Sequence, residues 1–290
     1  MIDLSYIQNP NSNTQIFQNG GTWQTWVKPK NAKIVYFTVA GSGGGGGGGF
    51  LAPTGIKTGG AGGGSCAVTK LAIQAILVPD ILYIYAAKGG QGGLGGVAGA
   101  STRGASGENS VICLQPDFTF NANIFTTSGT SPATGGQTGS LVNSAGGIAE
   151  ATTLVSIQAK ALFTNLGNYT ISTGVSGTSG GAAGGISSTV LNFVQAATGG
   201  GGTAGGGIGN GTEIIPTTPS SLANTNGSNG ITMYKPLFLR GGTGAGGGTN
   251  GGKGGNGAPG TGGGGGGAGT VSAGNGGNGG DGFVIITTNF

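Results

Sequence analysis

The sequence contains no histidine, only two cysteines and ten prolines, and only 11 basic and 7 acidic side chains among its 290 residues. The missing histidine excludes nucleophilic sites of the Ser–His–Asp and Cys–His kinds, apart from Ser–Lys variants. Cys66 and Cys113 form no CxxC pair and have no histidine to complete a zinc site. They are one disulfide or two buried thiols in neighbouring strands, and the buried thiols are the expectation.

Long hydrophobic runs are also missing. The longest apolar stretch, 71–87, is broken by Gln74, Pro79 and Asp80, so it is too short for a transmembrane helix of ~20 residues. The first residues lack the basic segment of a secretory signal, and neither a signal nor membrane insertion is expected. The net charge of +4 has its one local cluster at Lys28, Lys30 and Lys33. We interpret this cluster as the solvated start of a strand and expect no nucleic-acid partner.

Glycine supplies 74 residues, about a quarter of the chain. Intrinsic disorder is excluded by low charge and a slightly positive mean hydropathy. Collagen is excluded because glycine is not strictly every third residue and proline is scarce. The glycine runs lie at 41–49, 59–64, 89–107, 174–185, 199–211 and 241–282.

Several runs repeat with a period of three. Non-glycine residues recur at every third position at Lys88, Gln91, Leu94, Val97, Ala100, Arg103 and Ser106, at Asn250, Lys253, Asn256 and Pro259, and at Asn275, Asn278 and Asp281. Three residues per turn is the period of polyproline II. Because glycine lacks a Cβ, such helices can approach closely enough to hydrogen-bond to one another, with the side chains of the third edge pointing outward or into a sheet. We therefore predict a packed glycine lattice, rather than flexible linkers, at 88–107 and 241–282. Both alternatives stay open for 41–49, 174–185 and 199–211.

Strand patterns separate the glycine runs. Residues rich in Val, Ile, Phe and Tyr predict strands at 33–39, 66–76, 80–87, 110–114 and 282–288, with 66–76 and 80–87 joined by a turn at 78–80. Weaker patterns occur at 118–125, 154–159, 169–172, 190–194 and 231–239. Helix signals are scarce. The predicted fold is all-β, with small sandwich-like sheets, packed glycine-rich polyproline II helices and almost no α-helix.

The order of these features resembles the glycine-rich domain of bacteriophage tail and virion surface proteins. The resemblance rests on Trp23-x-x-Trp26-Val27-x-Pro29, KIVYFTVAGSGGGGGGG, GGAGGGSCAVTKLAI, the strand after Val78-Pro79-Asp80, AAKGGQGGLGG and GGNGGDGFVIIT, and covers about 20–114 and 265–288. A looser likeness is to the adhesins at T-even-type phage tail-fibre tips, which stack polyglycine helices. The resemblance implies a virion-surface location, other virion proteins as partners and a homo-oligomer such as a trimer. Residues 1–114 then form strands with glycine runs, 115–240 inserted recognition segments, and 241–290 a glycine run with a closing strand.

Catalysis is not expected, because the seven acidic residues are isolated in sequence and no cofactor or metal motif is present. A depolymerase would need Glu108, Asp117, Glu150 and Glu213 to meet in space. Binding of a host-cell receptor, either an outer-membrane protein or a glycan, is expected of aromatic and amide side chains. The candidates are Phe118, Phe120, Asn121, Asn123, Phe125, Asn165, Asn168 and Tyr169, with Tyr234 and Phe238 as a third group. Alternation of Phe118 and Phe120 also fits core packing, and Trp23 and Trp26 are expected to be structural.

The sequence thus supports a receptor-binding adhesin, with a structural capsid, spike or tail component as the alternative. Adhesin loops should be exposed and polar, whereas a structural subunit should bury the apolar runs 154–157 and 231–239 against its partners. Ice binding through a flat glycine-helix face is a third class, which the irregular 115–240 block argues against.

Overall fold

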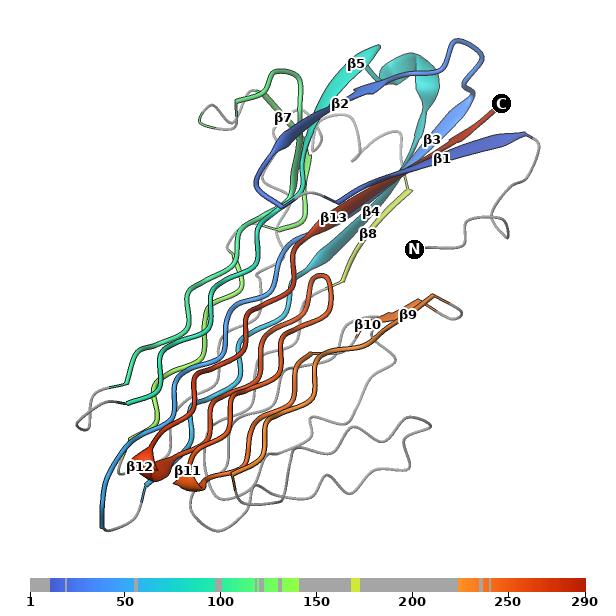
Figure 1. Cartoon of the computed structure of the whole chain (residues 1–290). Helices are drawn as coiled ribbons and strands as arrows, with labels where there is room; N and C mark the ends of the chain where they lie inside the picture. Colours follow the sequence, from blue (N-terminus) through green and yellow to red (C-terminus); the bar gives the residue numbers. More distant parts are fainter. Residues whose placement is uncertain are drawn as a thin grey trace.

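The computed structural model describes residues 11–18, 20–54, 57–96, 101–117, 119, 123–129, 132–140, 168–172, 224–234, 237–239 and 241–290. In this part of the chain, β-sheets occupy one end of the molecule and parallel rows of extended glycine segments lead away from them (Figure 1). The chain runs out along one glycine segment and returns along the next, so the two parts are built from alternating pieces of sequence.

The larger sheet has five strands, and every neighbouring pair is antiparallel. Its order is β1 (Ser12–Phe17), β13 (Phe283–Asn289), β3 (Ile34–Ala40), β4 (Val68–Gln74) and β8 (Asn168–Ser172). Strand β3 alternates as predicted, with Val35, Phe37 and Val39 buried. Strand β13 lies between β1 and β3, so the sheet joins segments that are far apart along the chain.

The second sheet has four antiparallel strands in the order β2 (Trp23–Val27), β5 (Ile81–Tyr85), β6 (Val111–Cys113) and β7 (Ile124–Thr127). Two short pairs complete the described strands. A hairpin of β9 (Thr232–Tyr234) and β10 (Leu237–Leu239) replaces the single strand predicted at 231–239, and β11 (Gly248–Asn250) pairs in parallel with β12 (Gly269–Ser272). The weaker strands predicted at 154–159 and 190–194 lie outside the described residues.

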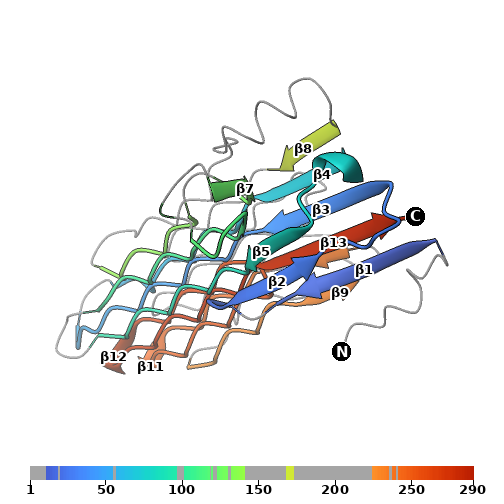
Figure 2. The same ribbon diagram turned by 90° about the horizontal axis from the view of Figure 1, so that it is seen from above.

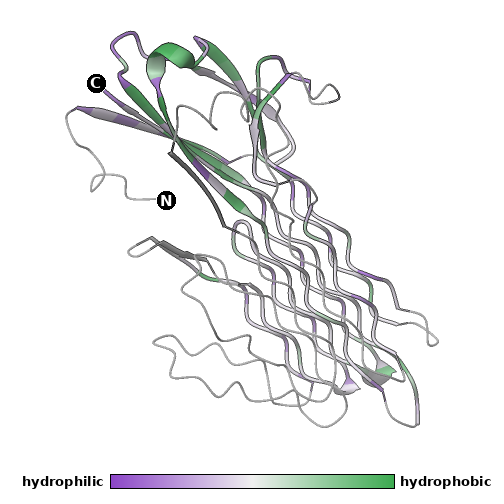
Figure 3. Cartoon of the chain, turned by 180° about the vertical axis from the view of Figure 1, so that it is seen from behind, coloured by the Kyte–Doolittle hydropathy of each residue, from purple (hydrophilic) through white to green (hydrophobic). Residues whose placement is uncertain are grey.

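The two sheets face each other across an apolar core, with β2 and β5 lying over β13 and β3 in Figure 2. Phe37 of the larger sheet packs edge-on against Trp26 and Phe125 of the smaller one, with ring centroids 6.1 and 5.6 Å away. Apolar residues concentrate in these sheets, and the glycine segments show little hydropathy of either sign (Figure 3). The all-β class is therefore confirmed, and Trp26 is structural as expected.

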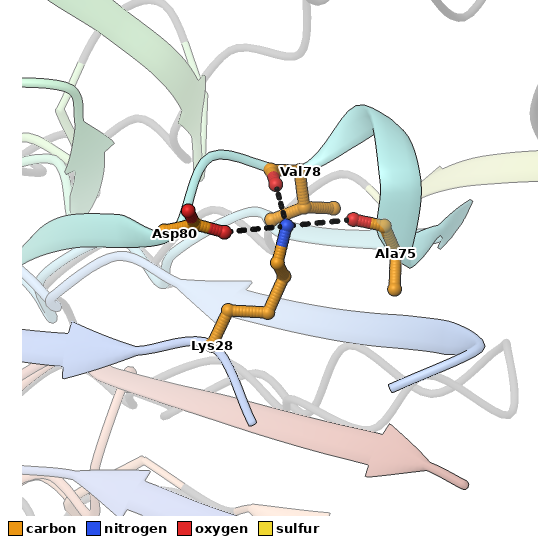
Figure 4. Close-up of polar contacts among 4 residues, drawn as sticks. All are labelled: Lys28, Ala75, Val78 and Asp80. Atoms are coloured by element: carbon orange, nitrogen blue, oxygen red, sulfur yellow. Dashed lines mark hydrogen bonds and ion pairs between the residues drawn. The ribbon is translucent and has the colours of Figure 1, made fainter. Parts of the chain in front are cut away.

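The turn at 78–80 carries the chain from one sheet to the other, so β4 and β5 do not pair as a hairpin. A 3₁₀ helix, Ala75–Leu77, begins this connection. Lys28 holds it in place: its Nζ donates to the carbonyl oxygens of Ala75 (3.1 Å) and Val78 (2.6 Å) and pairs with Asp80 at 2.9 Å (Figure 4). The expectation that Lys28 is solvated is wrong, because its side chain is 18% exposed and its ammonium group binds two carbonyls of the connection as well as Asp80.

Both cysteines are buried free thiols, as expected. They are not in neighbouring strands, because Cys66 precedes β4 and Cys113 lies in β6 of the other sheet. Burial, with a smaller contribution from the charge of Asp117, raises the pKa of Cys113 to about 12. The thiol form of Cys113 is therefore favoured at neutral pH.

Candidate functional site: the glycine lattice and its edges

The seven consecutive glycines at 43–49 form the central helix of a lattice. Successive N–H groups donate in rotation to three antiparallel segments: Gly43, Gly44 and Gly45 to Gly280, Gly64 and Ala105, and then Gly46, Gly47 and Gly48 to Gly277, Ala61 and Thr102. The carbonyl groups of the same helix accept from three parallel segments, 88–96, 132–140 and 261–268. The central helix therefore has six hydrogen-bonded neighbours, and the backbone groups along it are satisfied without water.

The close approach of these six neighbouring segments explains why residues 43–49 are all glycine. A Cβ built on any glycine from 43 to 49 would lie 1.9–2.2 Å from a neighbouring carbonyl oxygen. The second uninterrupted run, 262–267, is likewise bonded to five segments: 41–49, 57–65, 241–248, 250–258 and 273–282. An unbroken glycine run thus marks a helix inside the lattice, and a run with every third position substituted marks one at its edge.

The predicted lattice is confirmed at 88–96, 101–107 and 241–282, and the open alternative at 41–49 is resolved in favour of packing. The runs at 174–185 and 199–211 lie outside the described residues. Nine residues at ~3.1 Å each give a lattice segment a length of roughly 28 Å. The sheets anchor one end of the lattice, and its other end, the distal end, is carried away from them (Figure 1).

Asparagine and aspartate close the lattice edge. We expected the third edge, with Asn275, Asn278 and Asp281, to point outward or into a sheet, but the Oδ1 atoms of these side chains accept hydrogen bonds from the neighbouring lattice segment 88–96. The donors are the N–H groups of Gly95 (2.7 Å), Gly92 (2.9 Å) and Gly89 (2.8 Å), respectively. Asn226 and Asn229 do the same for the N–H groups of Lys253 and Asn256. An amide oxygen therefore replaces a backbone carbonyl at these edge positions.

A carboxylate fixes the junction between sheet and lattice. Glu108 accepts from the hydroxyl of Tyr85 at 2.8 Å and from the N–H of Lys88 at 3.1 Å. Burial, followed by the hydrogen bond and charge of Glu108, raises the pKa of Tyr85 to about 12. Asp117 accepts from the backbone and hydroxyl of Thr119, which lowers its pKa. Among the described residues no group of three His, Cys, Asp or Glu side chains is placed to hold a metal ion.

The structure describes four of the eight predicted recognition residues: Asn123, Phe125, Asn168 and Tyr169. Phe125 is 2% exposed and packs on Phe37, so it belongs to the core and is not available to a receptor. Asn123 precedes β7, and its carbonyl accepts from the N–H of Leu114. Asn168 and Tyr169 lie in β8, in register with Ala72 and Leu71. The remaining candidates, Phe118, Phe120, Asn121 and Asn165, lie outside the described residues.

Parts of the 115–240 block are integrated into the scaffold. Strands β7 and β8 extend the two sheets, and segments 132–140 and 224–230 bond to other lattice helices. The weak strand pattern at 169–172 indicated β8 and the pattern at 118–125 overlaps β7, but the sequence did not indicate the lattice segments 132–140 and 224–230, because their bonding partners lie far away along the chain. The described residues of the block therefore contribute to both sheets and to the lattice.

Separate hydrogen bonds connect the segments at the distal end of the lattice. Residues 50–52 bond to Gly269 at the start of β12, and the buried Lys57 donates its Nζ to the carbonyl of Ala52 at 2.6 Å. Exposed apolar side chains occur here, with Leu94 62% and Val271 68% exposed. The three-residue repeat includes Leu94 among its non-glycine positions, but no sequence pattern pointed to exposure of Val271.

The described residues include no helix with the length and apolar character needed to cross a membrane. A comparison with curated proteins found no match. The model of one family, described as a glycine-rich domain, matches residues 18–289, which includes the 115–240 block. Because this match covers nearly the whole sequence and the lattice accounts for the glycine content, the chain belongs to the glycine-rich domain family.

Proposed function

We propose that this protein is a virion surface protein, of a bacteriophage, that acts as a host-receptor-binding adhesin. The observation that carries the proposal is the hydrogen-bonded lattice, which extends roughly 28 Å from the sheets at ~3.1 Å per residue. Loops leaving such a scaffold have fixed ends. Less ordering entropy is then lost when the loops bind a cell surface.

The recognition residues proposed are the sequence candidates other than the core residue Phe125: Phe118, Phe120, Asn121, Asn123, Asn165, Asn168 and Tyr169. Homo-oligomerisation and several copies per virion would raise the effective concentration of each site. Weak individual contacts with an outer-membrane protein or a glycan would then give firm attachment. No step of this proposal requires a cofactor or catalysis.

A second candidate, a structural virion component, is favoured by the apolar residues at the sheet end. Val27 and Ile81, which are opposite one another on β2 and β5, are 61% and 49% exposed, and Ile76 is 86% exposed. Scattered apolar residues are common on surfaces, but a cluster at the end opposite the lattice suits attachment to another virion protein. The two functions are compatible if the sheet end attaches and the loops bind the host.

The test measures binding of the fluorescently labelled chain to a panel of candidate bacterial hosts. One variant changes Phe118, Phe120 and Asn121 to serine, which leaves β7 and the core residue Phe125 intact. The control variant changes Val27 and Ile81 to serine. Saturable binding that the first variant loses and the control retains supports the adhesin. Absence of cell binding, together with virion association that Val27→Ser/Ile81→Ser abolishes, would leave the structural role alone.

A further inference from the structure

A polar groove lies where the lattice meets the sheets, separate from the candidate recognition residues. Its volume is about 820 Å³, within the ~300–1,000 Å³ typical of ligand pockets. Three parts of the chain contribute polar side chains: the β1–β2 connection, the segment at 88–96 and the edge of the lattice. These side chains belong to Gln18, Thr22, Lys88, Gln91, Asn256, Asn278 and Asp281.

The lattice fixes the orientation of the groove amides. The Oδ1 of Asn278 accepts from the N–H of Gly92 at 2.9 Å, and the Oδ1 of Asn256 accepts from the N–H of Asn278 at 3.0 Å. Since only the oxygen of an amide can accept, these bonds define which end of each side chain is the Nδ2 donor. Asp281 is held similarly, with Oδ1 bonded to the N–H of Gly89 and Oδ2 as its second acceptor. The groove therefore offers donors and acceptors whose positions are set before a ligand arrives.

The charges of the groove limit the ligand. Lys88 and Asp281 are its two charged side chains, and their opposite signs favour neither a strong anion nor a strong cation. The other polar side chains are neutral amides and a hydroxyl, and Pro259 is the one apolar ring in the lining. A ligand that matches this lining is uncharged and carries many groups that both donate and accept.

We propose that this groove binds a saccharide. Sugar hydroxyls can accept from the Nδ2 groups of Asn256 and Asn278 and donate to the carboxylate of Asp281. No aromatic side chain lines the groove, so stacking contributes little and single-site affinity should be weak. The proposal rests on described residues alone and does not depend on the loops proposed to recognise a host.

The experiment probes the full chain with a densely printed array of bacterial O-antigen and capsular oligosaccharides, and titrates the strongest hit in solution by NMR. Asn278→Asp is the test variant, because Asp retains an oxygen for the N–H of Gly92 but replaces the Nδ2 donor with an acceptor. Asn275→Asp is the matched control. Asn275 makes the same bond to the N–H of Gly95, one helical turn away and outside the groove.

We expect the wild type to bind at least one saccharide, and Asn278→Asp to weaken binding about tenfold or more, since the Nδ2 donor is lost and an acceptor then faces the sugar oxygen. The affinity of Asn275→Asp for the saccharide should stay within about twofold of the wild-type affinity, because Asn275 is exposed and lies outside the groove. The proposal is overturned if no saccharide binds, if Asn278→Asp binds like the wild type, or if both variants weaken binding equally. The serine variant at 118, 120 and 121 should retain saccharide binding, which separates this proposal from the adhesin.

Discussion

A single methyl group at the centre of the lattice should destabilise the protein. A Cβ at Gly46 would lie 2.0 Å from the carbonyl oxygen of Gly264, whereas such contacts are essentially never shorter than 3.0 Å. In Gly46→Ala the segment 261–268 must therefore move by at least about 1 Å relative to 41–49. Two hydrogen bonds join these segments, from Gly263 to Gly44 and from Gly266 to Gly47, each 2.9 Å long.

The expected cost follows from these contacts. Overpacking costs about 1–3 kcal/mol, and weakening two hydrogen bonds costs about 0.5–1.5 kcal/mol each. Alanine reduces the entropy of the unfolded chain, which offsets up to about 1 kcal/mol. The net loss is on the order of 3 kcal/mol, which lowers the melting temperature of a chain of this length by roughly 5 °C.

Calorimetry of Gly46→Ala measures this loss directly. Ser106→Ala is the matched control, because Ser106 lies on an exposed edge of the same lattice and already carries a Cβ. The control should change stability by less than about 0.5 kcal/mol. The reasoning is refuted if Gly46→Ala melts at the wild-type temperature, because a methyl group would then be accommodated where the lattice leaves no room.

Three further predictions address the sheets. Phe125→Ala should cost about 3–5 kcal/mol in denaturant unfolding, because it removes a core ring; a loss of cell binding without loss of stability would contradict the core assignment. Lys28→Met should destabilise by about 1–3 kcal/mol, because it removes the hydrogen bonds from Nζ to the carbonyls of Ala75 and Val78, whereas 1 M NaCl alone should have little effect on the wild type. Tyr85 has a pKa raised to about 12, so its contribution to stability is full below pH 10 and is lost as pH rises to 12. Absorbance titration should find one tyrosine ionising near pH 12, and a normal pKa for every tyrosine would contradict the burial of Tyr85 together with its contact to Glu108.

The three-residue period was the most informative pattern in the sequence. It predicted the extended conformation and the need for neighbours, because only glycine at the other two positions lets backbones approach. It did not predict that Asn278 and Asp281 bond to the next helix, since an outward edge and an edge facing a neighbouring N–H have the same spacing. The groove was likewise not predictable, because its lining comes together only when the lattice meets the sheets.

Strand prediction worked where the local pattern was strong and failed where long-range pairing decides. Strands β3 and β13 were predicted within about one residue, from β-branched and aromatic alternation. Strand β1 was missed because Ser12–Phe17 is largely polar, and it forms by pairing with β13 at the edge of the sheet. The step between sheets after β4 was also missed, since a turn sequence does not specify whether the next strand pairs or crosses the core.

Hydrogen exchange by NMR tests the lattice most directly. The N–H groups of residues 43–49 all donate to neighbouring carbonyls, so they should exchange about a thousandfold or more slowly than in an unfolded peptide. The N–H groups of Gly90, Gly93, Gly263 and Gly266, which donate to this central helix, should be protected as well. Complete exchange of these amides within seconds would show that the glycine runs are flexible linkers and would contradict the lattice.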